Sequence, residues 1–586
     1  MYLNNKKLIN SIKFNLCFVI IVIPLVMYLH LVIGGEAATE IWGSFINISF
    51  YSYYKMIFFL AASFFLLISF LKYIDQNQLQ KSKYYIPIII YSILAITSTF
   101  AAKYRGIAIK GFPDRYENIF VLLGYMLLVV VVRNIVRDKK SFQLILRALF
   151  ISALILTIHG VLQFYNYDLL ATDFGRKLIT PAGLDFFIKR LSFVGRKVIY
   201  STMYNPNYVG SYASMLVILV LALYNVSQNK KRLFLLGIFS ALLFSFLIGS
   251  RSRAGFMGFI AGTVIILYMQ RQFLKKHWLR IFIIITAFTL VFITMNARSL
   301  DEIFSDVLFP KTEKEKYLEE EILPPITEVS SKAGKLKLKT AEAEFEIIMN
   351  SDQIKVLNKK PINVYNSKNE VKEVVFKGKQ YLNHSFQINE QKNYLIWNYG
   401  GKSAQFYYQD GQILMAGMHN NLYPLVEAES IGFEGYERLG SSRAYIWSRT
   451  LPLLKDTIFI GHGPDTYAMY FPQDDVIGKL KFFSNPEIIV DKPHNLYLQI
   501  AVNTGIISLL ALLYLWGDYI FSSFVLYNNS DLSSWKNRLG IALMGAVTAY
   551  LTAGFFNDSV ISVAPVFWII LGLGISINYL AKEDKF

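Results

Sequence analysis

Long apolar runs separated by short charged segments constrain the fold of this chain more than any other feature of its sequence. One run extends from Phe14 to Gly34 and another from Phe282 to Met295. A helix needs about 20 mostly apolar residues to cross a hydrocarbon layer about 30 Å thick. Because 54% of the residues are hydrophobic and only 17% are charged, these runs indicate a membrane protein and not a large soluble one.

The apolar runs predict an all-α polytopic membrane protein with about twelve transmembrane helices. Nine expected spans lie within residues 1–296 and three within 495–586, on either side of a long polar region over 297–494. The first run is too long for the apolar part of a signal peptide and no small-residue cleavage site follows it, so we expect an uncleaved first span. The expected spans cover residues 14–34, 55–73, 84–101, 118–136, 142–163, 206–226, 232–249, 254–270, 279–296, 495–525, 537–556 and 560–581.

The distribution of lysine and arginine favours one orientation in the membrane. Cytoplasmic loops are enriched in these residues. Every second loop, counted from a cytoplasmic N-terminus, is basic, which predicts that both termini are cytoplasmic and that residues 297–494 lie outside. The basic loops contain Lys81 and Lys83, Arg133 to Lys140, Lys230 to Arg232, Arg271 to Arg280, and Lys536 with Arg538.

The formal net charge is +18. In a soluble protein this charge would suggest a nucleic-acid partner. Here much of it falls in short loops between spans, where membrane topology and anionic headgroups account for it better. We therefore expect membrane lipids as partners and no nucleic acid.

Two loops expected on the outer side break the charge pattern. Cations held outside against the topology rule favour an anionic ligand, although ordinary solvated loops would also account for them. The cations are Lys103, Arg105, Lys110 and Arg115 within residues 102–117, and Arg176, Lys177, Lys189, Arg190, Arg196 and Lys197 within residues 164–205.

The polar region predicts a small β-rich insert over residues 334–417. Apolar and polar positions alternate there, for example at Leu336 and Leu338, and Asn, Gly and Asp cluster between the alternating runs. This pattern is typical of short strands in a sandwich-like domain, and we expect a helical part over 437–494 to follow it. Aromatic residues of the insert either form its core or stack on sugars; they are Tyr394, Trp397, Tyr399, Phe406, Tyr407 and Tyr408.

Two arginines lie in a very tight turn between two expected spans, Gly249 to Gly255. The topology places Arg251 and Arg253 at the outer membrane boundary. A charge near hydrocarbon is costly and is a functional candidate, although arginine can also reach the interface harmlessly. A guanidinium presents a planar fork of donors that matches phosphate oxygens. The pair therefore predicts an anion clamp.

A histidine precedes the tenth expected span, in Asp491-Lys492-Pro493-His494-Asn495. Proline is common at the start of a helix, so we expect His494 to lie at the outer end of this span. A histidine there can accept a proton near neutral pH. His494 is therefore a candidate general base, and a polar histidine at headgroup level is the other interpretation.

A third motif combines Arg443 and Trp447, which share one helical face, with the turn Gly461-His462-Gly463-Pro464-Asp465. Glycine and proline mark turns in general, so this turn alone has little specificity. No phosphate-binding loop, dinucleotide fingerprint, zinc-hydrolase motif or hydrolase nucleophile motif occurs in a supporting context. The single cysteine, Cys17, offers no cysteine-based metal site. ATP-driven transport and zinc hydrolysis therefore lack support in the sequence, and we expect no cofactor.

Together these motifs resemble the O-antigen ligase and O-antigen polymerase family of bacterial cell-envelope glycosyltransferases. The resemblance covers about residues 200–580 and includes the long outer loop between spans nine and ten. The insert over 334–417 enlarges that loop beyond the family's usual size. The matching motifs are Asn205-Pro206-Asn207-Tyr208, Ser252-Arg253-Ala254-Gly255, Arg443 with Trp447, Gly461-His462-Gly463-Pro464, and His494-Asn495 with Gly505.

The resemblance implies a GT-C-like membrane fold and a metal-independent transfer reaction. The donor would be a glycan joined through pyrophosphate to a polyprenol such as undecaprenol. The acceptor would be a hydroxyl on a glycan, a lipid or a wall polymer. The reaction would take place on the outer face of the bacterial cytoplasmic membrane, without a nucleotide sugar or ATP.

The resemblance also implies roles for the candidate site residues. The expected catalytic residues are His494, which would accept the proton of the attacking hydroxyl, and Arg253 and Arg443. The pyrophosphate would be bound by Arg251, Arg253 and Arg443. Further substrate contacts are expected at Asn207, Trp447, His462 and Asn495.

Other functions remain open from the sequence. A transporter or flippase of lipid-linked saccharides would place ionisable residues at mid-membrane, whereas the charges here gather at the outer edge. A sensory or adhesion protein would act through residues 334–417. Within the transferase class, a ligase makes a single-step transfer and a polymerase makes a ladder of products, and the sequence does not separate the two.

Overall fold

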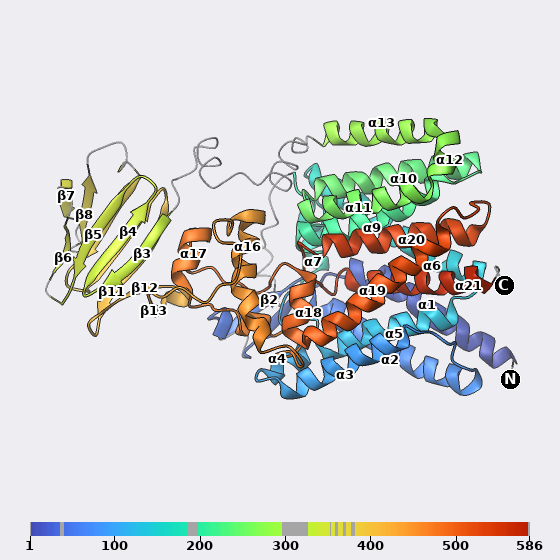
Figure 1. The fold of residues 1–586 in the computed structure, drawn as a ribbon, viewed down its shortest axis with the longest axis horizontal. Coiled ribbons are helices and arrows are strands. Elements are labelled where there is room, and N and C mark those ends of the chain that lie inside the picture. Colours follow the sequence, from blue (N-terminus) through green and yellow to red (C-terminus); the bar gives the residue numbers. More distant parts are fainter. Residues whose placement is uncertain are drawn as a thin grey trace.

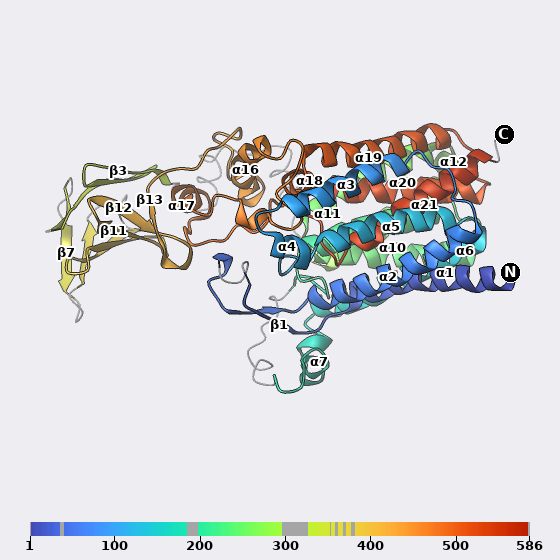
Figure 2. The same cartoon turned by 90° about the horizontal axis from the view of Figure 1, so that it is seen from below.

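The computed structural model describes residues 2–35, 40–184, 197–295, 326–351, 353–357, 361–366, 371–376, 381 and 383–583. A bundle of long helices forms one end of the molecule, and a β-domain over residues 326–424 forms the other (Figure 1). Short helices and loops lie between them. Both chain termini lie at the end of the bundle remote from the β-domain (Figure 2). We call the opposite bundle end, which faces the β-domain, the domain end.

Most long helices lie within a few residues of the expected spans. Among the residues that the structure describes, seven helices are long and apolar enough to cross a membrane, namely α1, α2, α6, α9, α10, α19 and α21. Helices α3, α5, α11 and α13 are shorter apolar helices. The long helices are α1 (Tyr2–Leu25), α2 (Tyr53–Gln76), α3 (Tyr85–Ala101), α5 (Ile119–Ile135), α6 (Lys139–Phe164), α9 (Pro206–Asn225), α10 (Lys230–Gly249), α11 (Arg253–Met269), α13 (Trp278–Thr294), α19 (Ile506–Tyr527), α20 (Trp535–Ala553) and α21 (Ala564–Glu583).

The outward surfaces of the bundle are apolar. Phe64 of α2 exposes 60% of its area, and Phe282 of α13 exposes 61%. Large exposed apolar surface on long helices is typical of contact with lipid. The chain is therefore a multi-pass membrane protein. The number of twelve spans and the orientation of the termini remain predictions.

Small residues bring α9, α11 and α20 into close contact at the centre of the bundle. A Cβ atom added to Gly255 would lie 2.6 Å from the backbone of Gly210, and one added to Gly258 would lie 2.3 Å from the carbonyl oxygen of Ala549. Helices in lipid commonly associate through such backbone contacts. The contact at Gly255 fixes the N-terminal ends of α9 and α11 relative to each other.

Two expected spans differ from the structure. The span predicted over 14–34 is wrong at both ends, because α1 begins at Tyr2 and ends at Leu25. After Leu25 the chain continues into a hairpin of β1 (His30–Ile33) and β2 (Ile46–Ser49). The single helix predicted over 495–525 is also wrong. It is two helices, α18 (Leu496–Thr504) and α19, separated at Gly505, which has a φ of +105°.

The break at Gly505 is stabilised by a segment from the preceding loop. His462 and Gly463 donate their backbone N–H groups, at 2.9 Å each, to carbonyl oxygens in the last turn of α18. Ile506 in turn donates its N–H to the carbonyl oxygen of Thr457 at 2.8 Å. These bonds occupy backbone groups that a helix end otherwise leaves without partners.

The β-domain is a sandwich of two antiparallel sheets. One has the order β3-β4-β5-β6 and the other β13-β12-β11-β10-β9-β8-β7. Phe345 of the first sheet packs with Trp397 and Phe406 of the second in the core. The strands are β3 (Ile326–Lys332), β4 (Lys335–Thr340), β5 (Glu344–Met349), β6 (Ile354–Val356), β7 (Pro361–Asn366), β8 (Lys372–Phe376), β9 (His384–Asn389), β10 (Tyr394–Tyr399), β11 (Lys402–Gln409), β12 (Gln412–Ala416) and β13 (Leu422–Pro424).

The structure divides the aromatic residues of this domain between two environments. Trp397, Tyr399 and Phe406 are buried, so stacking of these three on sugars is wrong. Tyr394 and Tyr407 are directly opposite each other on neighbouring strands, with ring centroids 5.8 Å apart, and are only partly buried.

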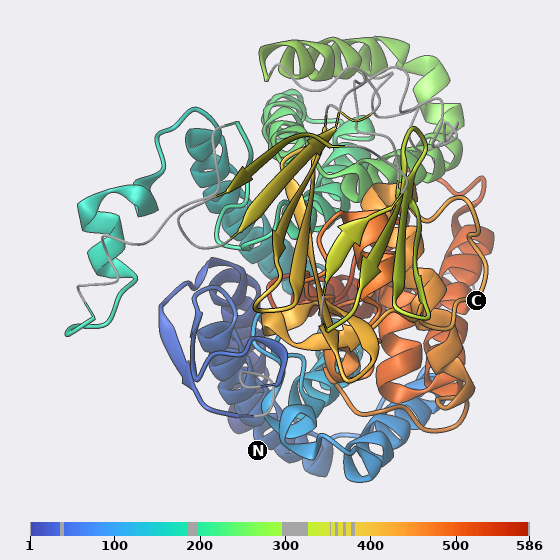
Figure 3. The same ribbon diagram turned by 90° about the vertical axis from the view of Figure 1, so that its left-hand side faces the viewer.

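Short helices connect the β-domain to the bundle (Figure 3). Val476 and Leu480 of α17 are part of the β-domain core. Asp475, which caps α17, accepts hydrogen bonds from Arg449 at 2.9 Å and from Tyr445 at 3.0 Å. The β-domain is therefore packed against the helical segment that precedes α18. The helices between the β-domain and the bundle are α16 (Leu439–Thr450) and α17 (Val476–Phe483). The other short helices are α4 (Arg105–Lys110), α7 (Asp173–Leu178) and α12 (Arg271–Lys276), and α12 lies at the end of the bundle remote from the β-domain (Figure 1).

Candidate active site

The starts of α9 and α11 are tied together at the domain end of the bundle. Asn205 caps α9 by accepting the backbone N–H of Asn207 at 2.9 Å. Ser252 caps α11 and donates its hydroxyl to Oδ1 of Asn207 at 3.2 Å. Arg253, the first residue of α11, is thereby held beside the start of α9.

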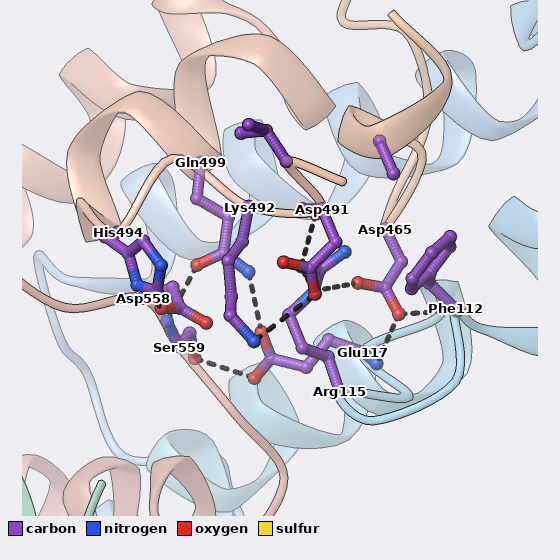
Figure 4. Close-up of polar contacts among 12 residues, drawn as sticks. Phe112, Arg115, Glu117, Asp465, Asp491, Lys492, His494, Gln499, Asp558 and Ser559 are labelled. Carbon is purple, nitrogen blue, oxygen red and sulfur yellow. Dashed lines mark hydrogen bonds and ion pairs between the residues drawn. The ribbon is translucent and has the colours of Figure 1, made fainter. Parts of the chain in front are cut away.

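His494 lies directly before the cap of α18 and faces Asp558 in the turn between α20 and α21 (Figure 4). Its Nδ1 is 3.4 Å from Oδ1 of Asp558; the carboxylate is fully buried, whereas the His494 side chain is 24% exposed. The φ of His494 is +50°, a conformation that is uncommon outside glycine and occurs preferentially at functional sites. One ring nitrogen thus faces a carboxylate and Nε2 is left for another partner.

Asp558 carries a negative charge at this site. The hydroxyl of Tyr208 donates to its Oδ2 at 2.7 Å. Burial alone would raise the pKa of this carboxyl, but His494, Lys492 and Arg115 together hold it well below its usual range. Motifs from three distant parts of the sequence therefore converge on Asp558.

Lys492 and Asp491 form a charged pair beside His494. The Nζ of Lys492 is 3.3 Å from Oδ2 of Asp491. Burial alone would lower the pKa of Lys492, but Asp491, Tyr208 and Asp558 raise it well above its usual value. Lys492 is therefore a cation at physiological pH.

Arg115 links the loop before α5 to this region. It is fully buried, and its Nε donates to Oδ1 of Asp465 at 2.8 Å while its Nη1 donates to the backbone carbonyl of Asp491 at 2.7 Å. Asp465 also accepts the backbone N–H groups of Phe112 at 2.7 Å and Glu117 at 3.0 Å. Arg115 is therefore neither a solvated loop residue nor an open anion site, because a carboxylate already neutralises it.

Glu117 extends the polar network into the bundle (Figure 4). It accepts hydrogen bonds from Tyr125 at 2.8 Å, from Ser559 at 2.6 Å and from Gln499 at 3.2 Å. Burial raises its pKa to about 8, although Ser559 and Tyr125 act in the opposite direction. Ser559 follows Asp558 directly, so Glu117 positions the turn that holds the carboxylate.

Arg443 begins the regular part of α16, after residues 440–442, all three of which have positive φ. Its Nη1 donates to the carbonyl oxygen of the first of these residues at 2.8 Å, and its buried Nε has no hydrogen-bond partner among the described residues. Burial lowers the pKa of Arg443, Asp558 raises it, and Arg253 lowers it further. Arg443 therefore lies within electrostatic reach of both Asp558 and Arg253.

Trp447 and Asn495 hold the segment that carries His494. The indole Nε1 of Trp447 donates to the carbonyl oxygen of Pro493 at 2.9 Å. Asn495 caps α18 and donates its side-chain amide to the carbonyl oxygen of Phe555 at 3.0 Å. Trp447 therefore holds the residue before His494, and the contact with Phe555 holds Asn495, the residue after it.

His462 and Arg251 lie at the margins of this arrangement. The ring of His462 stacks on Tyr470 with centroids 3.7 Å apart, and burial lowers its pKa. Arg251 is exposed in the turn before α11, with a φ of +53°. The structure thus places Arg443 near Arg253 and near Asp558, which faces His494. His462 instead packs on Tyr470, and Arg251 is exposed.

Residues 405–513 match the family model described as O-antigen ligase. This match covers less than a fifth of the chain and is consistent with an O-antigen ligase family. No curated protein and no solved structure matches the chain. The match supports a glycan-transferring role at the cell envelope, and the matched residues include Arg443, Trp447, His462 and His494.

Several parts of the site lie outside the matched residues 405–513, and sequence reasoning missed some of them. Asp558 and Glu117 were not singled out, and Tyr208 was noted only as part of a motif. The available signal was a polar triplet, 557–559, in a turn between two apolar spans. Within the described ranges, no group of three or more His, Cys, Asp or Glu side chains is arranged to hold a metal ion.

The cations expected in the outer loops have mixed outcomes. Lys103, Arg105 and Lys110 are exposed, and Arg115 is buried. In the second loop, Lys177 and Lys197 are exposed and Arg176 is partly buried, whereas Lys189, Arg190 and Arg196 lie outside the described residues.

Proposed function

We propose that this protein transfers a glycan from a polyprenyl-pyrophosphate carrier to an acceptor hydroxyl on the outer face of the bacterial cytoplasmic membrane. The observation that carries the proposal is the contact between His494 and Asp558 within reach of Arg443. An imidazole oriented by a carboxylate is suited to accept a proton. Guanidinium groups are suited to bind pyrophosphate. The match of residues 405–513 to the O-antigen ligase family supports this chemistry.

His494 acts as the general base in this proposal. Asp558 favours the tautomer with its proton on Nδ1, so Nε2 faces the acceptor hydroxyl. As the hydroxyl oxygen bonds to the anomeric carbon, its proton passes to Nε2, and the bond between that carbon and the pyrophosphate oxygen breaks. Asp558 stabilises the imidazolium that forms, and Tyr208 holds the carboxylate in place.

Arg253 and Arg443 bind the pyrophosphate of the donor and stabilise its charge as it leaves. Arg251 adds a third cation at the exposed edge of the same turn. A guanidinium stays charged at any physiological pH. Because the carrier arrives within the membrane, its pyrophosphate lies at the bilayer surface, where the turn between α10 and α11 carries two of these arginines.

The remaining predicted contacts position the site. Asn207 holds the start of α11 through Ser252, while Trp447 and Asn495 hold the segment around His494. His462 belongs to the loop that stabilises the break between α18 and α19. Direct contact of these residues with substrate stays a prediction. The proposed reaction uses no nucleotide, metal or cofactor, because the donor already carries its leaving group.

The decisive assay uses the full chain in vesicles with a polyprenyl-pyrophosphate-linked glycan and a hydroxyl acceptor. We expect a new glycosidic product and released polyprenyl pyrophosphate. Loss of the base in His494→Ala should lower the rate about 10²–10⁴-fold while donor binding persists. His277→Ala, an exposed histidine at the bundle end that carries the termini, should match the parent.

Three results would bear on this function. Equal turnover by His494→Ala and the parent would contradict the role of the base. Movement of the donor across the vesicle membrane without a new glycosidic bond would indicate a flippase. A ladder of products would show that the protein is a polymerase. A single transfer to a glycan, lipid or wall-polymer acceptor would show that it is a ligase.

A further inference from the structure

A cavity of about 770 Å³ lies at the domain end between β1, α4 and the first turns of α2 and α5. Its volume falls within the range of small-molecule pockets. Part of its wall is aliphatic or aromatic, formed by Met56 and Leu60 of α2, Ile107 and Ile109 of α4, and Phe120 of α5.

The apolar wall is continuous with the surface that faces lipid. Ile109 and Phe120, which line the cavity, expose 41% and 54% of their area, and Ile33 of β1 exposes 63%. Helix α2 is a candidate membrane span and α5 is a shorter apolar helix. A hydrocarbon chain can therefore enter the cavity from the bilayer without crossing water.

The rest of the lining includes polar side chains and a single charge. Among the described residues that line the cavity, Lys110 is the only Lys, Arg, Asp or Glu. The ring of His30 stacks on Tyr53 with centroids 3.4 Å apart, and burial lowers the pKa of His30, so it is neutral at physiological pH. The cavity therefore combines an apolar wall with one cation at an exposed position.

This cavity is separate from the candidate active site. Tyr116 and Asn118 line the cavity. Arg115 and Glu117, which alternate with them in the sequence, instead contact the buried network that includes Asp465. The loop before α5 therefore forms the wall between the two sites.

We propose that the cavity binds an anionic phospholipid, with an acyl chain against α2 and α5 and its phosphodiester at Lys110. One lysine matches the single negative charge of a phosphodiester. A pyrophosphate is matched better by arginine forks, which this lining lacks among its described residues. The inference goes beyond the transferase proposal and does not depend on it.

Native mass spectrometry of the detergent-solubilised full chain, titrated with phosphatidylglycerol, tests this site. Phosphatidylethanolamine is the zwitterionic comparison and undecaprenyl phosphate the isoprenoid comparison. Leu60→Trp fills the apolar wall, and Leu67→Trp is its matched control, two turns along the same face of α2 and exposed outside the cavity. Lys110→Gln removes the charge, and Lys103→Gln, at an exposed position in the turn before α4, is its control.

We expect phosphatidylglycerol to be retained in preference to phosphatidylethanolamine. Leu60→Trp should abolish that retention, and Lys110→Gln should weaken it about fivefold, while both controls bind as the parent does. Unchanged binding in Leu60→Trp and Lys110→Gln would overturn the proposal. Stronger retention of undecaprenyl phosphate than of phosphatidylglycerol would overturn the choice of a phospholipid. Because the readout is lipid binding, failure of the transferase proposal would leave this result unaffected.

Discussion

The indole Nε1 of Trp447 donates a hydrogen bond of 2.9 Å to the backbone carbonyl of Pro493, the residue directly before His494. This bond joins α16, which carries Arg443, to the segment with the proposed base. Trp447→Phe keeps an aromatic ring but removes the donor, so we expect kcat to fall about tenfold with little change in KM for the donor. Trp278→Phe, on the exposed face of α13, is the control. An effect on KM alone would contradict this positioning role.

The carboxylate of Asp558 is predicted to orient His494 and stabilise its protonated form. Asp558→Asn preserves the shape but removes the charge, so transfer should slow about 10²-fold while donor affinity stays the same. Tyr208→Phe removes one hydrogen bond to Oδ2 and should have a smaller effect, about tenfold. Single-turnover rates with bound donor measure both, and Asp531→Asn in the exposed loop before α20 is the control. If Asp558→Asn kept the parent rate, the carboxylate would have no part in the reaction.

The proposed pyrophosphate site depends on the fork geometry of guanidinium. Arg253→Lys and Arg443→Lys keep the charge but lose bidentate hydrogen bonding, so each should raise KM for the donor about tenfold. Arg271→Lys, just beyond the other end of α11, should not. Donor titrations of the initial rate provide the measurement. Full activity of both lysine variants would rule out bidentate binding.

Glu117 makes stability depend on pH. Burial raises its pKa to about 8 from an ordinary value of 4.5, so between these values the folded protein retains a proton that the unfolded chain releases. Stability from this group is therefore greatest at low pH and is lost as pH rises through about 8. In thermal-shift measurements in detergent, the parent should lose more thermal stability between about pH 5 and about pH 8 than Glu117→Gln does. Parallel curves would show that Glu117 does not titrate in this range.

Composition and apolar run length were sufficient to predict most of the long helices, because lipid-facing segments are apolar along their whole length. They were insufficient where tertiary contacts shape the backbone. The break at Gly505 depends on hydrogen bonds from His462 and Gly463, and nothing within residues 495–525 specifies that partner. The chain after Leu25 is similar, since residues 26–33, which lead into the hairpin, are as apolar as those of a span.

The chemistry of single residues was easier to predict than their pairing. His494 and Arg443 were identified by side-chain type and motif, and the structure brings them together. Asp558 was missed because its partner Tyr208 lies 350 residues away, and the polar triplet 557–559 does not indicate which residues it contacts. Arg115 was identified as a cation, but only the fold reveals Asp465, which neutralises it.

In the proposed reaction, His494 and the arginines act on one donor molecule at one site. A cryo-electron microscopy structure of the His494→Ala chain with bound polyprenyl-pyrophosphate-linked glycan tests it most directly. We expect density for the pyrophosphate between Arg253 and Arg443, with the first sugar facing the position that the imidazole of His494 occupies in the parent. Pyrophosphate density away from both arginines, or a first sugar out of reach of position 494, would contradict it.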